Sequence, residues 1–141
     1  MVDNLFSICV RFLQWLGTAT GLTYKEISVI FNLWIQDAVL LLSAALPMAV
    51  AIMRQTRGLR VSATSWALSS VILVIYLLFS IWLIHHYSGR MDDIFDTCVN
   101  DLLNLANTFH TTYNTVNIVI FVILWLLAVG SNILIALQIK K

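Results

Sequence analysis

The chain has 141 residues and a formal net charge of +1, and 60% of its residues are hydrophobic whereas only 11% are charged. Soluble domains carry roughly 25% charged residues, so this composition excludes an ordinary water-soluble surface and indicates a protein embedded in a lipid bilayer. A nearly neutral chain also lacks the basic surface on which nucleic-acid binding depends, and we expect no nucleic-acid partner.

The first predicted element is an amphipathic helix over residues 3–16. Polar side chains recur along it at spacings of three and four residues, with Arg11 on the polar side and Trp15 near the end. Such a helix lies in the membrane interface, with its apolar side in lipid. A spanning helix is the less favoured alternative here, because Arg11 at mid-depth costs about 2.5–3.5 kcal/mol on insertion scales. The glycines at Gly17 and Gly21 are expected to end the helix.

Two long apolar runs then flank a short basic turn at residues 54–60. The first helix is predicted over residues 27–54, with its span at about 34–53, and the second over residues 61–84. Apolar runs of this length are typical of lipid-spanning helices, and a turn this short makes the two helices antiparallel neighbours.

Two local features support the first of these helices. A capping-box sequence of the form T-x-x-E runs from Thr23 to Glu26, directly before the apolar run, and predicts the start of a helix. Ala45 and Ala49 give a small-xxx-small pattern, which favours close contact with another helix in the membrane.

A hydrophilic segment over residues 85–117 separates the second run from a third apolar helix, predicted over residues 116–139. Within this segment, apolar residues recur at helical spacing over residues 91–109, which predicts a second amphipathic helix. The acids and asparagines of this helix, with Asp101 among them, are expected on its other face.

The distribution of charge predicts an orientation in the membrane. Five of the eight basic residues lie in the basic turn and at the C-terminus, and all seven acids lie in segments predicted for the opposite side. The positive-inside rule therefore places the turn and the C-terminus in the cytoplasm and residues 85–117 outside, in a plasma or inner membrane. The residues that determine this orientation are Arg54, Arg57, Arg60, Lys140 and Lys141.

Several polar residues in or near the spans are candidates for a site. Asp37 is the acid nearest a hydrophobic core. It serves either as an ion or proton site or partner of a cation in an oligomer, or as a residue near the outer interface that is hydrated or hydrogen-bonded beside Gln36 and Asn32. A line of hydroxyl side chains along the second span either lines a water-filled path or allows close helix packing. Asn132 is expected to hydrogen-bond another helix, because an unpaired amide in lipid is costly. The pore-lining or packing candidates are Asp37, Ser62, Ser65, Ser69, Tyr76, Ser80 and Asn132.

The chemistry of the remaining residues is sparse. Cys9 and Cys98 both fall on the predicted outer side, where a disulfide between them is possible, although each is equally an ordinary packing residue. The sequence lacks metal-ligand spacing, a phosphate loop and the motifs of hydrolases, so we predict no metal, no cofactor, no catalytic residue and no enzyme activity.

We therefore predict a single all-α integral membrane domain over residues 1–141, with three transmembrane helices and two amphipathic interfacial helices. Its general build, a few spans and a short basic tail, is similar to that of phage holins and of the small membrane immunity proteins of pore-forming toxins. The predicted function is non-catalytic: the protein acts through helix–helix interactions with a partner or with itself, as a subunit or immunity-type factor. The alternative is a homo-oligomeric, holin-like pore or channel lined by the serine line of the second span.

Overall fold

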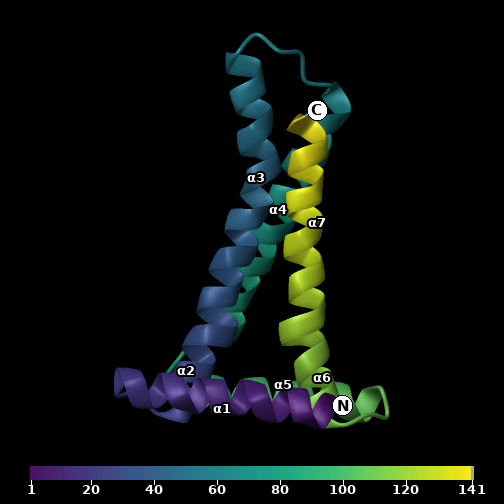
Figure 1. The fold of residues 1–141 in the computed structure, drawn as a ribbon. Helices are drawn as coiled ribbons and strands as arrows, with labels where there is room; N and C mark the ends of the chain where they lie inside the picture. The colour runs from purple at the N-terminus through teal and green to yellow at the C-terminus, as the bar shows by residue number, and fades with distance from the viewer. Residues whose placement is uncertain (141) are drawn as a thin grey trace.

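The computed structural model describes residues 1–140, and the regular structure in this part of the chain is helical, with no strand. Three of the described helices are long and apolar enough to cross a membrane, which confirms the predicted all-α class and the number of potential spans. Figure 1 shows these three helices rising together from one end of the molecule. They cover Tyr24–Thr56, Ala63–His86 and Tyr113–Ile139.

Two of the three long helices contain a π-helical segment near the same end. The first consists of α2 (Tyr24–Val29), η1 (Ile30–Ile35) and α3 (Gln36–Thr56). The second is α4 (Ala63–His86), which is α-helical throughout. The third consists of α6 (Tyr113–Ile118), η2 (Val119–Leu124) and α7 (Trp125–Lys140).

Side-chain caps explain where the long helices begin. The Thr23 hydroxyl accepts a hydrogen bond from the backbone N–H of Glu26, and the Glu26 carboxylate accepts one from the backbone N–H of Thr23, so the predicted capping box is confirmed. Ser62 caps α4 and Thr112 caps α6 in the same way, each accepting from the backbone N–H three residues later. These caps satisfy donors that a helix leaves unpaired at its start.

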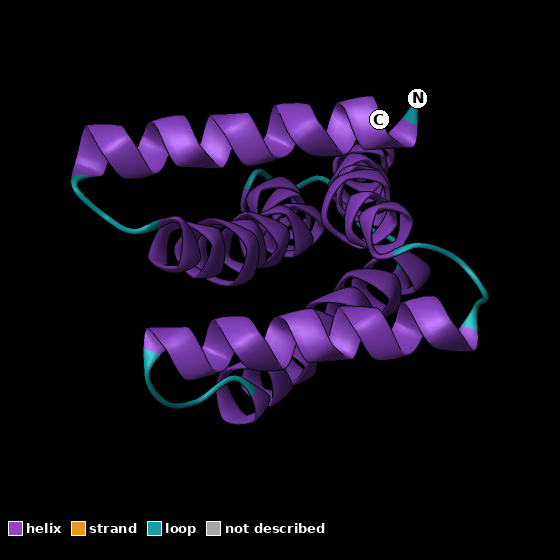
Figure 2. Ribbon diagram, turned by 90° about the horizontal axis from the view of Figure 1, so that it is seen from below, coloured by secondary structure: helices purple, strands orange, loops and turns teal. Residues whose placement is uncertain are grey.

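Two further helices, α1 (Val2–Thr20) and α5 (Met91–Thr108), lie across the end of the bundle from which the long helices rise (Figure 1). Seen from that end in Figure 2, they run along opposite sides of the long helices, and we call them the transverse helices. Thr20 rather than Gly17 ends α1, followed by Gly21 in the left-handed conformation with φ 75°. Gly17 instead lies buried under the carbonyl of Leu22, where a Cβ would be 2.9 Å from that oxygen.

The bundle is built around α3, which packs closely against both α7 and α4. Small residues at the contact make this possible, because Ala44 and Ala51 are fully buried and Pro47 is almost fully buried. The small-residue face therefore differs from the predicted one, since Ala49 is exposed. The observed face instead has an i, i+3, i+7 spacing, which follows the helix period.

Apolar clusters hold the transverse helix α5 against the long helices. Ile94 packs with Val29 and Leu33 in one cluster, and Leu102 packs with Val116 in a second. The transverse helix α1 contacts α2 and α6. Aromatic edge contacts support it, between Phe6 and Tyr113 at 5.9 Å and between Phe12 and Phe31 at 5.8 Å. Both transverse helices are thus fixed parts of the fold.

The opposite end of the molecule carries the basic turn between α3 and α4, close to the C-terminus (Figure 1). Arg54 donates a hydrogen bond of 2.8 Å from its guanidinium to the carbonyl of Ile139. A cation at the C-terminal end of a helix satisfies free carbonyls and complements the helix dipole. Arg57 and Arg60 are exposed, and Lys141 lies outside the described residues. The three arginines of the basic turn therefore lie at the same end of the molecule, whereas their side of the membrane stays a prediction.

Candidate functional site

A partly open cavity of about 540 Å³ lies next to the transverse helices. Residues of η1, α3, α4, α5, η2 and α7 line it. It arises because α4 and α7 both pack on α3 and make little contact with each other. Its lining is mostly apolar, which is typical of small-molecule sites, whose volumes run from about 300 to 1,000 Å³.

Asp37 lines this cavity near the start of α3. The Ser80 hydroxyl of α4 donates a hydrogen bond of 2.9 Å to Oδ1 of Asp37, which links the two helices. Among the described residues, no group donates to the second carboxylate oxygen. The structure thus adds a helix-bridging role to the two interpretations of Asp37 from the sequence. It also places the Asp37 carboxylate at the cavity.

A second carboxylate, that of Asp101 on α5, lines the same cavity. Its Oδ2 accepts a hydrogen bond of 2.8 Å from the Tyr87 hydroxyl and lies 3.1 Å from Nε2 of His86. Burial of the tyrosine ring, together with the hydrogen bond to Asp101, raises the pKa of Tyr87 above its ordinary value. The neutral phenol is thereby held in place as a donor to Asp101.

The sequence predicts Asp101 on the polar face of α5, whereas the structure turns it toward the cavity, with 38% of its side chain exposed. Its helical position is shared with Ile94, Cys98 and Leu105, which lie seven residues before, three before and four after it. That spacing is the signal that identifies Asp101 as a residue turned toward the protein. Tyr87, its hydrogen-bond partner, carries no comparable signal in the sequence.

Two hydrogen bonds join the first and third long helices at the cavity wall, beside their π-helical segments. The Gln36 side-chain amide donates a hydrogen bond of 2.9 Å to the carbonyl of Phe121 in η2. In return, the Trp125 indole N–H donates one of 3.0 Å to the carbonyl of Gln36. A π-helical turn changes the regular i→i+4 pairing and makes carbonyls available to other donors. The pair of bonds therefore ties the first long helix to the third at the level of the cavity.

The hydroxyl line of α4 lies mainly where α4 packs on α3. Ser69 is fully buried and donates to the carbonyl of Ser65 at 2.8 Å, and Ser80 is buried and bonded to Asp37. Ser62 caps the helix and shares a hydrogen bond with Ser65, whose hydroxyl lies 2.9 Å from that of Ser62. Tyr76 is half-buried and lines the cavity. The line is thus used for capping and packing within a single chain.

Asn132 lies deep in the contact between α7 and α3, with 3% of its surface exposed. Its amide donates a hydrogen bond of 3.0 Å to the Ser43 hydroxyl, which itself donates to the carbonyl of Leu40 at 2.7 Å. This is the interhelical hydrogen bond that the sequence led us to expect of Asn132. The Ser43 partner was not identified from the sequence.

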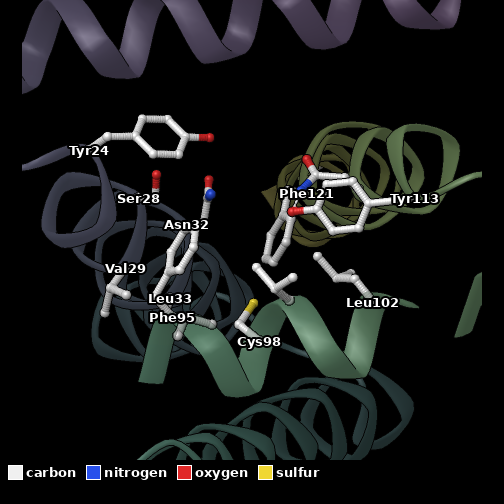
Figure 3. Close-up of a pocket in the computed structure, with 12 residues that line it drawn as sticks. Tyr24, Ser28, Val29, Asn32, Leu33, Phe95, Cys98, Leu102, Tyr113 and Phe121 are labelled. Carbon is white, nitrogen blue, oxygen red and sulfur yellow. Dashed lines mark hydrogen bonds between the residues drawn. The ribbon is translucent and has the colours of Figure 1, made fainter. Parts of the chain in front are cut away.

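A smaller pocket of about 30 Å³ lies between α2, η1, α5 and α6 (Figure 3). In Figure 3 the hydroxyl of Tyr24, Ser28 and the amide of Asn32 follow one another along one side, and Tyr113 faces them from the other. The Ser28 hydroxyl is buried and has no hydrogen-bond partner within the described chain. The pocket is large enough for a water molecule, which buried polar groups commonly use as a partner.

Cys9 and Cys98 are both free thiols in the structure. Burial raises the pKa of Cys98 to about 11, with a smaller contribution from the nearby carboxylate of Asp101. Within residues 1–140, no group of three or more His, Cys, Asp or Glu side chains is placed to hold a metal ion.

Comparison of the chain with protein-family models, with characterised proteins and with solved structures yields no significant match.

Proposed function

We propose that the protein is a small, non-catalytic, multi-pass membrane protein that acts through helix–helix interactions with a partner or with a second copy of itself. The proposal places it in a plasma or inner membrane, with the basic turn and the C-terminus in the cytoplasm and the transverse helices on the outer side. The proposal rests on which side chains pack inside the chain and which remain exposed. The main observation in its support is a feature of α4.

That feature is an apolar seam on α4, opposite the side that packs on α3. The seam residues alternate at spacings of four and three, which is the pattern by which two helices pack along a shared stripe. All of them are exposed, and the exposed fractions of the four larger ones range from 52% to 62%. The seam consists of Ala67, Val71, Val74, Leu78 and Ile81.

The polar groups of the spans support an interaction role. Asn132, Gln36 and Ser80 each form a hydrogen bond that joins two helices of the same chain. These bonds leave the outer side of α4 free of polar groups that a water-filled path would need. A pore lined by the serine line draws no support from this arrangement, because Ser69 is covered within one chain.

The transverse helix α1 supports the proposed location in a membrane. It exposes an apolar stripe at spacings of three and four, whereas Asn4, Arg11 and Gln14 lie beside it. A helix with one apolar and one polar exposed side lies in the plane of the membrane interface. The exposed apolar stripe consists of Leu5, Ile8, Phe12 and Trp15.

Disulfide cross-linking in vesicles that contain this protein as their sole protein tests the seam. In a chain with Cys9 and Cys98 changed to Ala, Leu78→Cys should give a covalent dimer on mild oxidation. Phe79→Cys is the matched control, because Phe79 is the next residue, is exposed to 43%, and lines the cavity instead. We expect the control to stay monomeric.

Two results would contradict the proposal in different ways. If the Leu78→Cys and Ile81→Cys variants both stayed monomeric on oxidation, self-association through the seam would be excluded. Ion and dye leakage from the same vesicles would favour the pore, and Ser69→Trp should then block the flux. Tight vesicles with cross-linked dimers are the result that self-association through the seam requires.

A further inference from the structure

The large cavity combines an apolar, aromatic wall with acidic side chains. Two carboxylates, those of Asp37 and Asp101, line it, and no Lys or Arg is found among its lining residues. Six aromatic side chains from α4, η2, α7 and the α4–α5 connection also line it. They are Tyr76, Phe79, Trp82, Tyr87, Phe121 and Trp125.

Asp37 is the less compensated of the two acids. It belongs to the first long apolar helix, and the described contact to its carboxylate is a neutral hydroxyl, that of Ser80. An ionised carboxylate beside an apolar cavity is costly unless a cation or several donors accompany it. Acids within membrane-spanning helices accordingly face a partner charge or a binding path.

Asp101 is better supplied with donors, from Tyr87 and His86. Trp82 stacks on the His86 ring at a centroid distance of 4.9 Å, which fixes this wall of the cavity. One oxygen of Asp101 still has no donor among the described residues. The acidic character of the cavity is therefore strongest at Asp37 and extends toward α5.

We propose that this cavity binds a lipophilic monovalent cation, such as an onium ion or a protonated amine that carries apolar groups. The carboxylate of Asp37 neutralises its charge, and the faces of the aromatic rings add cation–π attraction. The aliphatic and aromatic walls cover its apolar groups, as in other small-molecule sites. An anion of the same shape is repelled by both carboxylates, and a neutral acyl chain gives Asp37 no partner.

Tetraphenylphosphonium and tetraphenylborate test this assignment, because they have similar size and shape and opposite charge. Binding to the purified full-length protein in a neutral detergent is followed by isothermal titration calorimetry. We expect saturable binding of tetraphenylphosphonium at one site per chain and no saturable binding of tetraphenylborate. Asp37→Asn should weaken the phosphonium at least tenfold, because the amide oxygen still accepts from Ser80 while the charge is lost. Asp101→Asn should weaken it less.

Two further variants keep the test independent of folding. Asp93→Asn removes an exposed charge of α5 that lies outside the cavity and should leave the affinity unchanged. Ala128→Trp keeps both carboxylates and fills space at the cavity wall, so it should abolish binding. Equal binding of the two ions, unchanged affinity in Asp37→Asn, unchanged affinity in Ala128→Trp, or absence of saturable binding would each overturn the proposal. The cavity would then be left as space for lipid or for a partner helix.

Discussion

The hydrogen bond between Asn132 and Ser43 should contribute measurably to the stability of the contact between α7 and α3. Both side chains are buried, the donor–acceptor distance is 3.0 Å, and the Ser43 proton is already engaged with the Leu40 carbonyl. The serine oxygen is therefore oriented to accept. Interhelical bonds in membranes average about 0.6 kcal/mol and reach about 1.7 kcal/mol in double-mutant cycles. The geometry of this pair predicts a coupling free energy of about 1–1.5 kcal/mol.

The measurement is a double-mutant cycle of Asn132→Ala and Ser43→Ala, with the free energy of unfolding determined in mixed detergent micelles. Asn132→Ala alone should cost about 2–3 kcal/mol, because it also removes buried packing volume. Asn107→Ala is the control, since Asn107 is exposed on α5 and should change the stability by less than about 0.5 kcal/mol.

The cycle can refute the reasoning directly. A coupling free energy indistinguishable from zero would mean that the hydrogen bond does not hold the helices together, even if each single variant is destabilised. The observed losses would then come from packing alone, and Asn132 would have no special role at this contact.

Three other predictions follow from the structure. Gly17→Ala should destabilise the turn between α1 and α2 by about 1–3 kcal/mol, because its Cβ would lie 2.9 Å from the Leu22 carbonyl oxygen. Faster hydrogen exchange of the α1 amides would show this loss. Gly130→Ala is the control and should have no such effect, because the space around Gly130 is open. Burial raises the pKa of Cys98 from 9.0 to about 11, so the stability that this thiol contributes is complete below pH 9 and is lost as the pH rises toward 11. This loss is about 3 kcal/mol, and thermal unfolding between pH 7 and pH 11 should show a steeper decline for the wild type than for Cys98→Ala. Finally, a cysteine at Gln55 should react with a membrane-impermeant maleimide from the cytoplasmic side, and labelling from the outer side alone would reverse the proposed orientation.

Much of the fold follows from features that the sequence expresses locally. A long apolar run has few alternatives to a spanning helix, and the capping box at Thr23 forms within four consecutive residues. The end of α1 was harder to predict, because Gly17 and Gly21 are the same residue type in different roles. Gly21 supplies a positive φ, whereas Gly17 supplies room for a carbonyl that comes from the following turn.

The site was less predictable, because it depends on how the helices are rotated about their axes. In a helix that is apolar on all sides, the hydrophobic pattern does not indicate which face meets a neighbour. The sequence therefore singled out Ser69 and Ser80 without indicating that they lie against α3. The bond from Gln36 ends at a carbonyl inside the π-helical segment η2, that of Phe121, and the amino-acid pattern of this segment does not predict an i→i+5 turn.

The two π-helical segments also make the spacing of residues along these helices a determinant of the structure. An i→i+5 bond encloses one residue more than an i→i+4 bond, and each residue of an α-helix turns the chain by about 100°. Deleting one residue within η1 would therefore restore a regular helix and swing α2, together with the α1 packed on it, around the axis of α3. The two bonds at Gln36 belong to α3 and would stay, whereas the contacts of α1 with α6 and of α2 with α5 would be lost. The number of residues in the π-helical segments, as well as the side chains, thus sets the direction of the transverse helices.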